Sequence, residues 1–160
     1  YYPDSKGRYE LHHSDGVLLE ELKDKADYLD AVITDPPYVL HAEQYTNDER
    51  DISNLDHKEY MDKIKDNFKQ LHRLIKKSNF DNKEFYPVIF KVGTGRRGTS
   101  GIVDMDADFQ GIAKECGFVL WDKLFTELAS SPWATLNWER NYINKYVQKN
   151  YETNLVFVRF

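Results

Sequence analysis

The residues best suited to chemistry in this 160-residue sequence are the consecutive Asp35-Pro36-Pro37-Tyr38. Asp35 offers carboxylate acceptors, and the two prolines remove two backbone N–H donors from the segment. The local carbonyls and the carboxylate therefore present an edge that only accepts hydrogen bonds, which matches a planar amino group with its two donors. Tyr38 supplies a flat face on which a nucleic-acid base could stack, an interaction of ~1–3 kcal/mol per base. The tetrapeptide predicts a site that holds the amino group of a base.

The alternative to a site is a structural turn, since Asp-Pro-Pro also terminates strands and Tyr38 could simply cover the core. Residues 31–34 are apolar enough to form a parallel strand buried on both faces. Such a strand would deliver Asp35 to the edge of an open α/β sheet, where ligands bind outside the carboxyl ends of the strands. This context favours the site, and we expect Asp35 at the end of a central strand, with Asp15 and Gly93 at neighbouring strand ends.

The elements that would position this site alternate between strand-like and helix-like patterns, which predicts a three-layer α/β fold. The expected strands are residues 9–13, 31–34, 85–92, 118–125 and 154–160. The expected helices are one with Leu18, Leu19 and Leu22 that Ser14 or Asp15 caps, one after Asp56, and one at 106–116. Residues 39–55 and 93–98 are expected to be loops, and a loop as long as the first is often functional.

The second and third helices have the clearest signals. Asp56 followed by Glu59 is typical of a capping box, and Gly117 can end the third helix in a left-handed conformation. Behind Asp56, apolar residues recur at spacings of three and four, which predicts an amphipathic helix. These residues are Tyr60, Ile64, Phe68, Leu71 and Leu74. The single cysteine, Cys116, lies in the apolar pattern of the third helix, so we expect it to pack there.

Composition excludes several classes of protein. The net charge of −5 and the pI near 5.5 argue against a protein that simply coats DNA, because phosphate neutralisation needs basic residues. One cysteine excludes an internal disulfide and a multi-cysteine zinc site, and the histidines show no ligand spacing, so we expect no metal. No run of about 18 apolar residues occurs, and the first residues carry no signal-peptide pattern. We therefore expect no membrane span and a cytoplasmic protein.

Residues 30–38, with the sequence Asp-Ala-Val-Ile-Thr-Asp-Pro-Pro-Tyr, resemble the catalytic motif of the N6-adenine and N4-cytosine DNA methyltransferases. Other segments resemble this family in the same order along the chain: residues 13–16 with the following helix, 51–55, 91–93 with 96–98, 117–118, and 149–152 leading into 155–157. The resemblance covers most of residues 9–160. It implies an α/β, Rossmann-like methyltransferase sheet that is mostly parallel, with an antiparallel strand near the C-terminus. Residues 1–160 would then be a single methyltransferase catalytic-domain fragment.

The chain departs from the family in two places. No Phe-x-Gly-x-Gly segment occurs, so the main glycine loop for the cofactor is missing from these residues and we expect an incomplete cofactor site. This loop could lie before residue 1 or beyond residue 160, since the order of motifs varies in these enzymes. Tyr151 stands where the family usually has histidine before the glutamate of the closing strand. We expect the isolated fragment to be inactive.

The resemblance implies methyl transfer from S-adenosyl-L-methionine to an exocyclic amino group of a DNA base, without a covalent enzyme intermediate. The catalytic residues would be Asp35, Pro36, Pro37 and Tyr38. By the same resemblance, Asp15 and Asp35 would bind the cofactor. Arg96 and Arg97, in the basic segment next to the target pocket, would contact DNA.

Aspartate at the first motif position favours adenine N6 as the target, because serine is commoner in the cytosine-N4 enzymes of the family. The alternatives are a cytosine-N4 enzyme, an RNA base methyltransferase, and an inactive methyltransferase-like subunit that binds DNA. A restriction-modification partner or a homodimer would fit such an enzyme. Residues 93–98 also suggest a phosphate loop, but they lack its Lys-Ser or Lys-Thr ending, so nucleotide hydrolysis is not expected.

Overall fold

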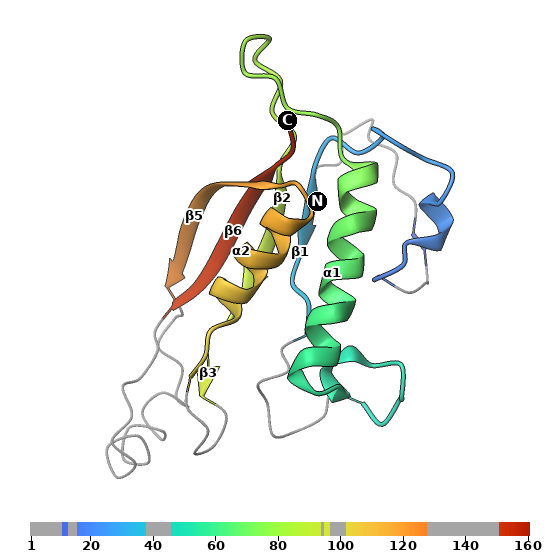
Figure 1. Ribbon diagram of the computed structural model, residues 1–160, viewed down its shortest axis with the longest axis vertical. Helices are drawn as coiled ribbons and strands as arrows, with labels where there is room; N and C mark the ends of the chain where they lie inside the picture. Colours follow the sequence, from blue (N-terminus) through green and yellow to red (C-terminus); the bar gives the residue numbers. More distant parts are fainter. Residues whose placement is uncertain (1–10, 13–15, 38–45, 94, 97–101, 128–150) are drawn as a thin grey trace, which may run out of the picture.

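The computed structural model describes residues 11–12, 16–37, 46–93, 95–96, 102–127 and 151–160. In these residues four strands form one sheet in the order β1-β2-β6-β5 (Figure 1). The strands are β1 (Val32–Thr34), β2 (Val88–Val92), β5 (Val119–Glu127) and β6 (Tyr151–Val158). A separate two-stranded sheet is formed by β3 (Gly95–Arg96) and β4 (Ile102–Val103). The described helices are α1 (His57–Leu74), α2 (Met105–Glu115) and the 3-10 helices η1 (Glu20–Leu22) and η2 (Ile52–Asn54).

β6 is the antiparallel strand of the larger sheet. β1 pairs with β2 in parallel, whereas β6 runs antiparallel to both of its neighbours, β2 and β5. β1, β2 and β5 therefore point the same way, and β6 is inserted between two of them. The predicted α/β sheet, mostly parallel with an antiparallel strand near the C-terminus, is confirmed.

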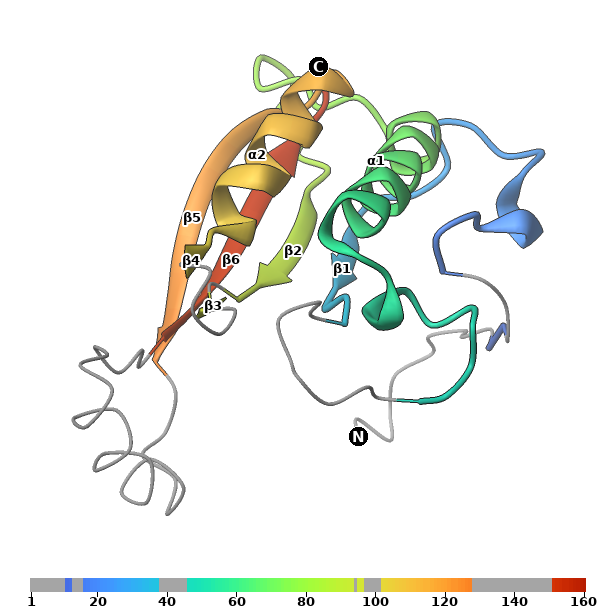
Figure 2. The same cartoon turned by 60° about the horizontal axis from the view of Figure 1, so that its bottom comes forward.

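One face of this sheet is covered by α1 and α2, which lie side by side on it (Figures 1 and 2). At the centre of the layer is Phe68 of α1. Its ring centroid lies 4.6 Å from that of Phe90 on β2 and 5.5 Å from that of Phe157 on β6, and Phe109 of α2 approaches it at 6.2 Å. All four side chains are buried, and burying each contributes about 1.5–3 kcal/mol to stability. The described residues thus form a sheet with one helical layer packed on it.

α1 begins and packs as its sequence predicts. The Asp56 carboxylate accepts a hydrogen bond from the Glu59 amide at 2.9 Å, and the Glu59 carboxylate accepts one from the Asp56 amide at 3.4 Å. This capping box satisfies amide groups for which the first turn has no helical partner. The apolar residues predicted for the inner face are all buried: Tyr60, Ile64, Phe68, Leu71 and Leu74.

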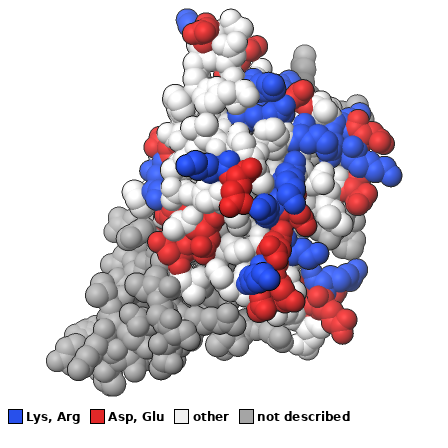
Figure 3. All heavy atoms as spheres, in the orientation of Figure 1, with Lys and Arg blue, Asp and Glu red and all other residues white. Residues whose placement is uncertain are grey.

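The outer surface of the helical layer is polar and carries charges of both signs (Figure 3). Lys65 of α1 pairs with Glu115 of α2 at 2.6 Å, and Lys69 pairs with Asp66 at 2.9 Å. Cys116, which follows α2, is half-buried, and its burial raises the pKa of the thiol. None of the helices in the described residues has the length and apolar character needed to cross a membrane.

The region before β1 differs from the prediction. The expected α-helix with Leu18, Leu19 and Leu22 is wrong, because only the three residues of η1 are helical there, in 3-10 geometry. Leu19 precedes η1 with a left-handed φ of 50°, which interrupts an α-helix, and Leu18 is 41% exposed. Ser14 and Asp15, the expected caps, lie outside the described residues.

The position of β1 in the sheet also differs from the prediction. Residues 31–34 were expected to form a central strand buried on both faces, which is wrong for the described part of the chain. β1 is at the edge of the sheet there, paired with β2. The Ile33 side chain, on the face opposite the helices, is 80% exposed, because the helical layer covers one face of the strand.

Two shorter segments also differ from the prediction. Residues 93–98 were expected to be a loop, but Gly95 and Arg96 form β3 and pair with Val103 and Ile102 of β4. Of the strand expected at residues 9–13, the structure describes residues 11–12, and neither is in a strand. Neither difference alters the order of the main elements.

Two glycines, one within α2 and one after it, give opposite predictions for substitution by alanine. Gly117 follows α2 with a φ of 86°, and a Cβ there would lie 3.0 Å from His72 Nε2. Gly117→Ala should therefore lower the free energy of unfolding by about 1 kcal/mol or more. Gly111 is the matched control: it lies within α2, and an added Cβ would meet nothing within 4 Å. Gly111→Ala should raise that free energy by about 0.5–1 kcal/mol. Urea unfolding measures both changes in the free energy of unfolding. Changes of the same sign would contradict the conclusion that α2 ends before Gly117.

Candidate active site

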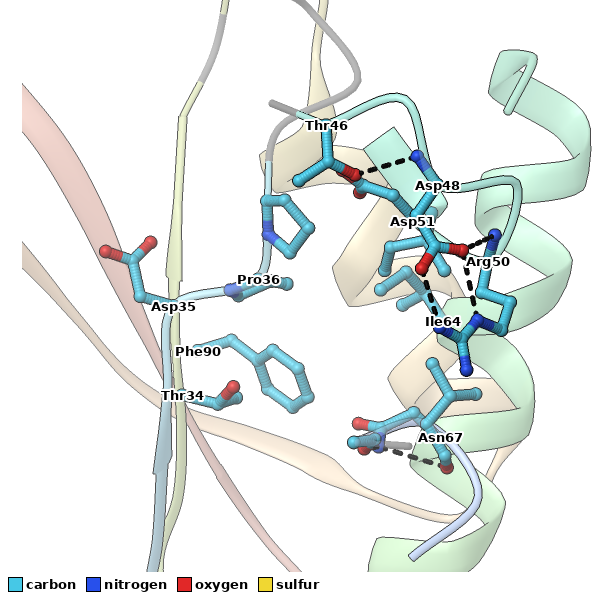
Figure 4. A pocket seen from close by; sticks show the side chains of 14 residues that line it. Thr34, Asp35, Pro36, Thr46, Asp48, Arg50, Asp51, Ile64, Asn67 and Phe90 are labelled. Carbon is cyan, nitrogen blue, oxygen red and sulfur yellow. Dashed lines mark hydrogen bonds and ion pairs between the residues drawn. The ribbon is translucent and has the colours of Figure 1, made fainter. Parts of the chain in front are cut away.

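The carboxyl end of β1 opens onto a cavity of about 600 Å³. Its walls come from the turn at 16–17, the end of β1, residues 46–52 and the inner side of α1 (Figure 4). The apolar lining is Val17, Pro36, Pro37, Ile52, Ile64 and Phe90. The polar lining is Thr34, Asp35, Thr46, Asp48, Arg50, Asp51 and Asn67. A cavity of several hundred Å³ with apolar walls and a few polar groups suits a small organic molecule or a cofactor.

The wall formed by residues 46–52 is held by its own hydrogen bonds (Figure 4). The Asp48 carboxylate accepts from the Arg50 guanidinium at 2.6 Å and from the Arg50 backbone amide at 2.9 Å. These hydrogen bonds, the side-chain one first, lower the pKa of Asp48 to about 2. The Asp51 carboxylate accepts from the Ser53 amide at 2.9 Å, which is the main reason that the pKa of Asp51 lies below its ordinary value. This wall carries two ionised carboxylates at neutral pH.

Asn67 ties the opposite wall of the cavity to α1. It is 9% exposed, and its side-chain nitrogen donates hydrogen bonds to the carbonyls of Gly16 at 2.8 Å and Val17 at 3.3 Å. The turn that follows Asp15 is thereby fixed against the helix. Asn67 was not among the predicted site residues. Its spacing of three residues from Ile64 places a polar side chain on the buried face of α1, and that signal was available in the sequence.

Successive side chains along a strand point to opposite faces of the sheet, and this holds at the ends of β1 and β2. Thr34 and its β2 partner Phe90 point toward the cavity, whereas the Asp35 carboxylate points the other way (Figure 4). There Asp35 Oδ2 lies 3.2 Å from Lys91 Nζ, and Lys91 Nζ lies 2.8 Å from Glu152 Oε2. The hydrogen bonds to Glu152 and then to Asp35 raise the pKa of Lys91. Lys91 is therefore a cation at neutral pH, shared between two carboxylates.

The structure describes some of the predicted site residues. It brings Asp35, Pro36 and Pro37 together at the cavity. Gly93 directly follows β2, so it lies at the same edge of the sheet as Asp35, as expected. The backbone of Arg96 belongs to β3. The other predicted site residues lie outside the described part of the chain: Asp15, Tyr38 and Arg97. Within that part, no group of three or more His, Cys, Asp or Glu side chains is arranged to hold a metal ion.

Several solved structures have a fold similar to that of this chain. TTHA0409 of Thermus thermophilus, assigned as a DNA modification methylase, matches 91% of this chain and 50% of its own, with a TM-score of 0.62 and 17% identity. The PvuII DNA methyltransferase, which is cytosine-N4-specific, matches 92% of this chain and 48% of its own, with a TM-score of 0.66 and 19% identity. The chain has the DNA methyltransferase fold. M1.HpyAVI in complex with SAM also matches it, over 94% of this chain and 53% of its own, with a TM-score of 0.51 and 18% identity.

These similarities concern the fold, because the sequence identities are low. The chain spans about half the length of each of these proteins. No protein-family model matches the sequence, and no curated protein is significantly similar to it. The resemblance predicted from the motifs is thus confirmed at the level of the fold: the described residues share the Rossmann-like sheet of these methyltransferases.

The contacts of Asn67 predict the effect of exchanging its amide for a carboxylate. Asn67→Asp would aim an acceptor at the carbonyls of Gly16 and Val17, so it should lower the free energy of unfolding by about 1–3 kcal/mol. It should also speed amide hydrogen exchange in the turn at 16–17, which mass spectrometry can follow. Gln70→Glu is the matched control on the same helix. The Gln70 side-chain oxygen accepts a hydrogen bond from Arg73 at 3.0 Å, and a carboxylate would accept it equally well. Equal effects of the two substitutions would show that the added charge, and not the turn, is responsible.

Proposed function

We propose that this chain is part of the catalytic domain of an S-adenosylmethionine-dependent DNA methyltransferase that modifies an exocyclic amino group of a base. The observation that carries the proposal is the position of Asp35-Pro36-Pro37 after β1, at a cofactor-sized cavity, in a chain with this fold. Ligands of open α/β sheets bind at the carboxyl ends of the strands. Because one fold can serve many functions, the proposal depends on this accepting tripeptide more than on the fold.

The cavity fits the cofactor that the proposal requires. Its volume of about 600 Å³ lies within the range of cofactor pockets. Val17, Ile52 and Ile64 offer apolar walls for the adenosyl group, and the ionised Asp51 complements a positively charged ligand, whereas Arg50 offsets the charge of Asp48. When bound, S-adenosylmethionine supplies a methyl group activated by its attachment to a sulfonium. TTHA0409 has been solved in complex with this molecule.

Asp15 and Asp35 are the further cofactor-binding residues that we propose; Asp35 lines the cavity, and it would contact the cofactor through atoms other than its carboxylate, which points away (Figure 4). Asp15 directly precedes Gly16, which lines the cavity and accepts the hydrogen bond from Asn67. The glycine loop that the resemblance leads us to expect is missing from the sequence of residues 1–160. The cofactor site in this chain is therefore proposed to be incomplete, and the isolated chain to be inactive.

Asp35 and the Pro36 carbonyl would accept hydrogen bonds from the amino group of the target base. Because Pro36 and Pro37 have no N–H, two potential backbone donors are removed from this edge. The acceptors would orient the amino nitrogen and localise its lone pair, so that catalysis consists mostly of positioning. Tyr38 would stack on the base, which must swing out of the duplex before its amino group can be reached.

Adenine N6 is the target that we propose, because Asp35 occupies a motif position where cytosine-N4 enzymes commonly carry serine. The similarity to PvuII, a cytosine-N4-specific enzyme, makes cytosine the second candidate. Arg96 and Arg97 are proposed to contact the phosphate backbone, since they follow β2 near the edge that carries Asp35. The face of the helical layer in Figure 3 mixes both signs of charge, which suits phosphate binding less well.

The proposed role of Asp35 can be tested in the intact protein that carries this chain. Asp35→Ala should lower the kcat of methyl transfer to DNA by at least about 100-fold, because the amino group would lose its acceptor. The protein should still fold, since the Asp35 side chain is 53% exposed. Asp30→Ala is the control, because Asp30 precedes β1, is 75% exposed and pairs with Lys76 at 2.6 Å. Transfer of labelled methyl groups is measured with DNA that contains adenine and with DNA that lacks it, which identifies the target base. Unimpaired transfer by Asp35→Ala would remove the basis for assigning Asp35 a catalytic role. Label on cytosine would show that the target base is cytosine and would leave the proposed mechanism in place.

The proposed DNA contacts predict a change in salt dependence. Replacing Arg96 and Arg97 together by alanine should weaken DNA binding and reduce the slope of log K against log salt by roughly 2, since two phosphate contacts are lost. Fluorescence anisotropy over a range of salt concentrations measures this slope. Replacing Lys58 and Lys63 of α1, which are exposed, removes the same charge from another surface. The same slope for both double variants would argue for a general charge effect and against a local contact.

A further inference from the structure

Lys91 connects the proposed catalytic carboxylate to a second carboxylate on a different strand. Its Nζ lies 3.2 Å from Asp35 Oδ2 and 2.8 Å from Glu152 Oε2. Asp35 follows β1, Lys91 belongs to β2, and Glu152 is near the start of β6. Three strands therefore each contribute one charged group to the same point at the edge of the sheet.

The register of the sheet places these groups on the face away from the helices. The β1–β2 pairing ends at Phe90 of β2, so Asp35 and Lys91 come next on two parallel strands and point to the face opposite Phe90. On its other side, Lys91 pairs with Asn154 of β6. Glu152 lies two residues before Asn154 and so shares its face. Because β6 is antiparallel, its first residues reach the edge where β1 and β2 end.

The three side chains differ in exposure. Glu152 is the most enclosed, with 18% of its side chain exposed, compared with 35% for Lys91 and 53% for Asp35. The shorter of the two contacts is also the one to Glu152, so Glu152 is the firmer anchor for the ammonium group. A charge-assisted hydrogen bond favours one orientation of a carboxylate, and a cation between two carboxylates offsets their mutual repulsion.

We propose that Lys91 is a positioning residue for methyl transfer: anchored by Glu152, it orients the Asp35 carboxylate beside the amino group of the target base. This inference rests on the proposed function, which gives Asp35 its role. Lys91 acts through Asp35 and does not itself contact the base. The two prolines after Asp35 donate no backbone hydrogen bond that could orient its carboxylate, and the Lys91 ammonium supplies such a donor.

The test compares Lys91→Met with Lys91→Arg in the intact protein. Methionine keeps an unbranched side chain and removes the charge, whereas arginine keeps a cation that can bridge two carboxylates. Lys91→Met should lower the kcat of methyl transfer to DNA about 10–100-fold, as expected for a misdirected catalytic group. The KM for S-adenosylmethionine should change less than kcat does, since Lys91 is not among the residues that line the cavity and the Asp35 carboxylate points away from it (Figure 4). Lys91→Arg should retain most of the kcat.

Three further variants test the role of Glu152 and the specificity of the effect. Glu152→Gln keeps an acceptor for Lys91 but removes the charge, so it should lower kcat less than Lys91→Met does. Combining Glu152→Gln with Lys91→Met should add little, because both act through the same contact. Lys76→Met is the matched control and should leave kcat unchanged. Lys76 also pairs with an aspartate, Asp30, and its side chain is 38% exposed, but it lies at the other end of β1.

The outcomes separate this inference from the proposed function. A folded Lys91→Met protein with the kcat of the unmodified protein overturns the inference, and so does a Lys91→Arg protein as slow as Lys91→Met. If thermal unfolding shows that Lys91→Met does not fold, the folded Glu152→Gln protein decides, and an unchanged kcat overturns the inference. Failure of the proposed function itself would be recognised by full activity of Asp35→Ala. Loss of activity in that variant with normal kcat in the Lys91 variants would contradict only the role of Lys91.

Discussion

The parallel pairing of β1 with β2 determines which side chains meet at the edge of the sheet. It ends with Thr34 opposite Phe90, and both face the helices. A slip of β1 by one residue would exchange the two faces of that strand. Thr34 would then leave the cavity, and Asp35 would point into it, away from Lys91 on β2. The apolar packing that holds the register therefore also determines the arrangement of charges at the site.

α1 couples the core to the cavity through two consecutive residues. Phe68 packs against both central strands of the sheet, and the adjacent Asn67 holds the turn at 16–17. Consecutive residues of an α-helix point about 100° apart, so one helix can face the sheet and the cavity wall at the same time. A shift of α1 along the sheet would move the turn as well. The shape of the cavity is thus fixed by the same contacts that stabilise the fold.

The parts of the fold that could be predicted from the sequence are those with local signals. The capping box and the apolar spacing of α1 involve residues three and four apart, and the positive φ of Gly117 follows from its place after α2. The contact between Lys91 and Asp35 joins residues 56 apart, and that between Asn67 and Gly16 joins residues 51 apart. No local pattern shows which strands are neighbours, so these contacts could not be predicted. The antiparallel strand was expected only because of the family resemblance.

The errors concern apolar residues whose burial depends on distant packing. Ile33 was expected to be buried and is 80% exposed, and Leu18, which was expected in an α-helix, is 41% exposed. An apolar side chain indicates burial only where another element covers it. Asp35-Pro36-Pro37 was easier to place, because it follows the apolar residues of β1 directly and its position relative to that strand is local.

β5 and β6 are also connected at the edge of the sheet that carries Asp35. β5 ends at Glu127, which pairs with Tyr151 at the start of β6. The chain therefore leaves the sheet after Glu127 and returns to it at Tyr151, which directly precedes Glu152. Connecting segments tolerate insertions and substitutions far better than the strands that they join. The length and sequence of the connection between β5 and β6 can thus change while the strands that hold the charged groups stay paired.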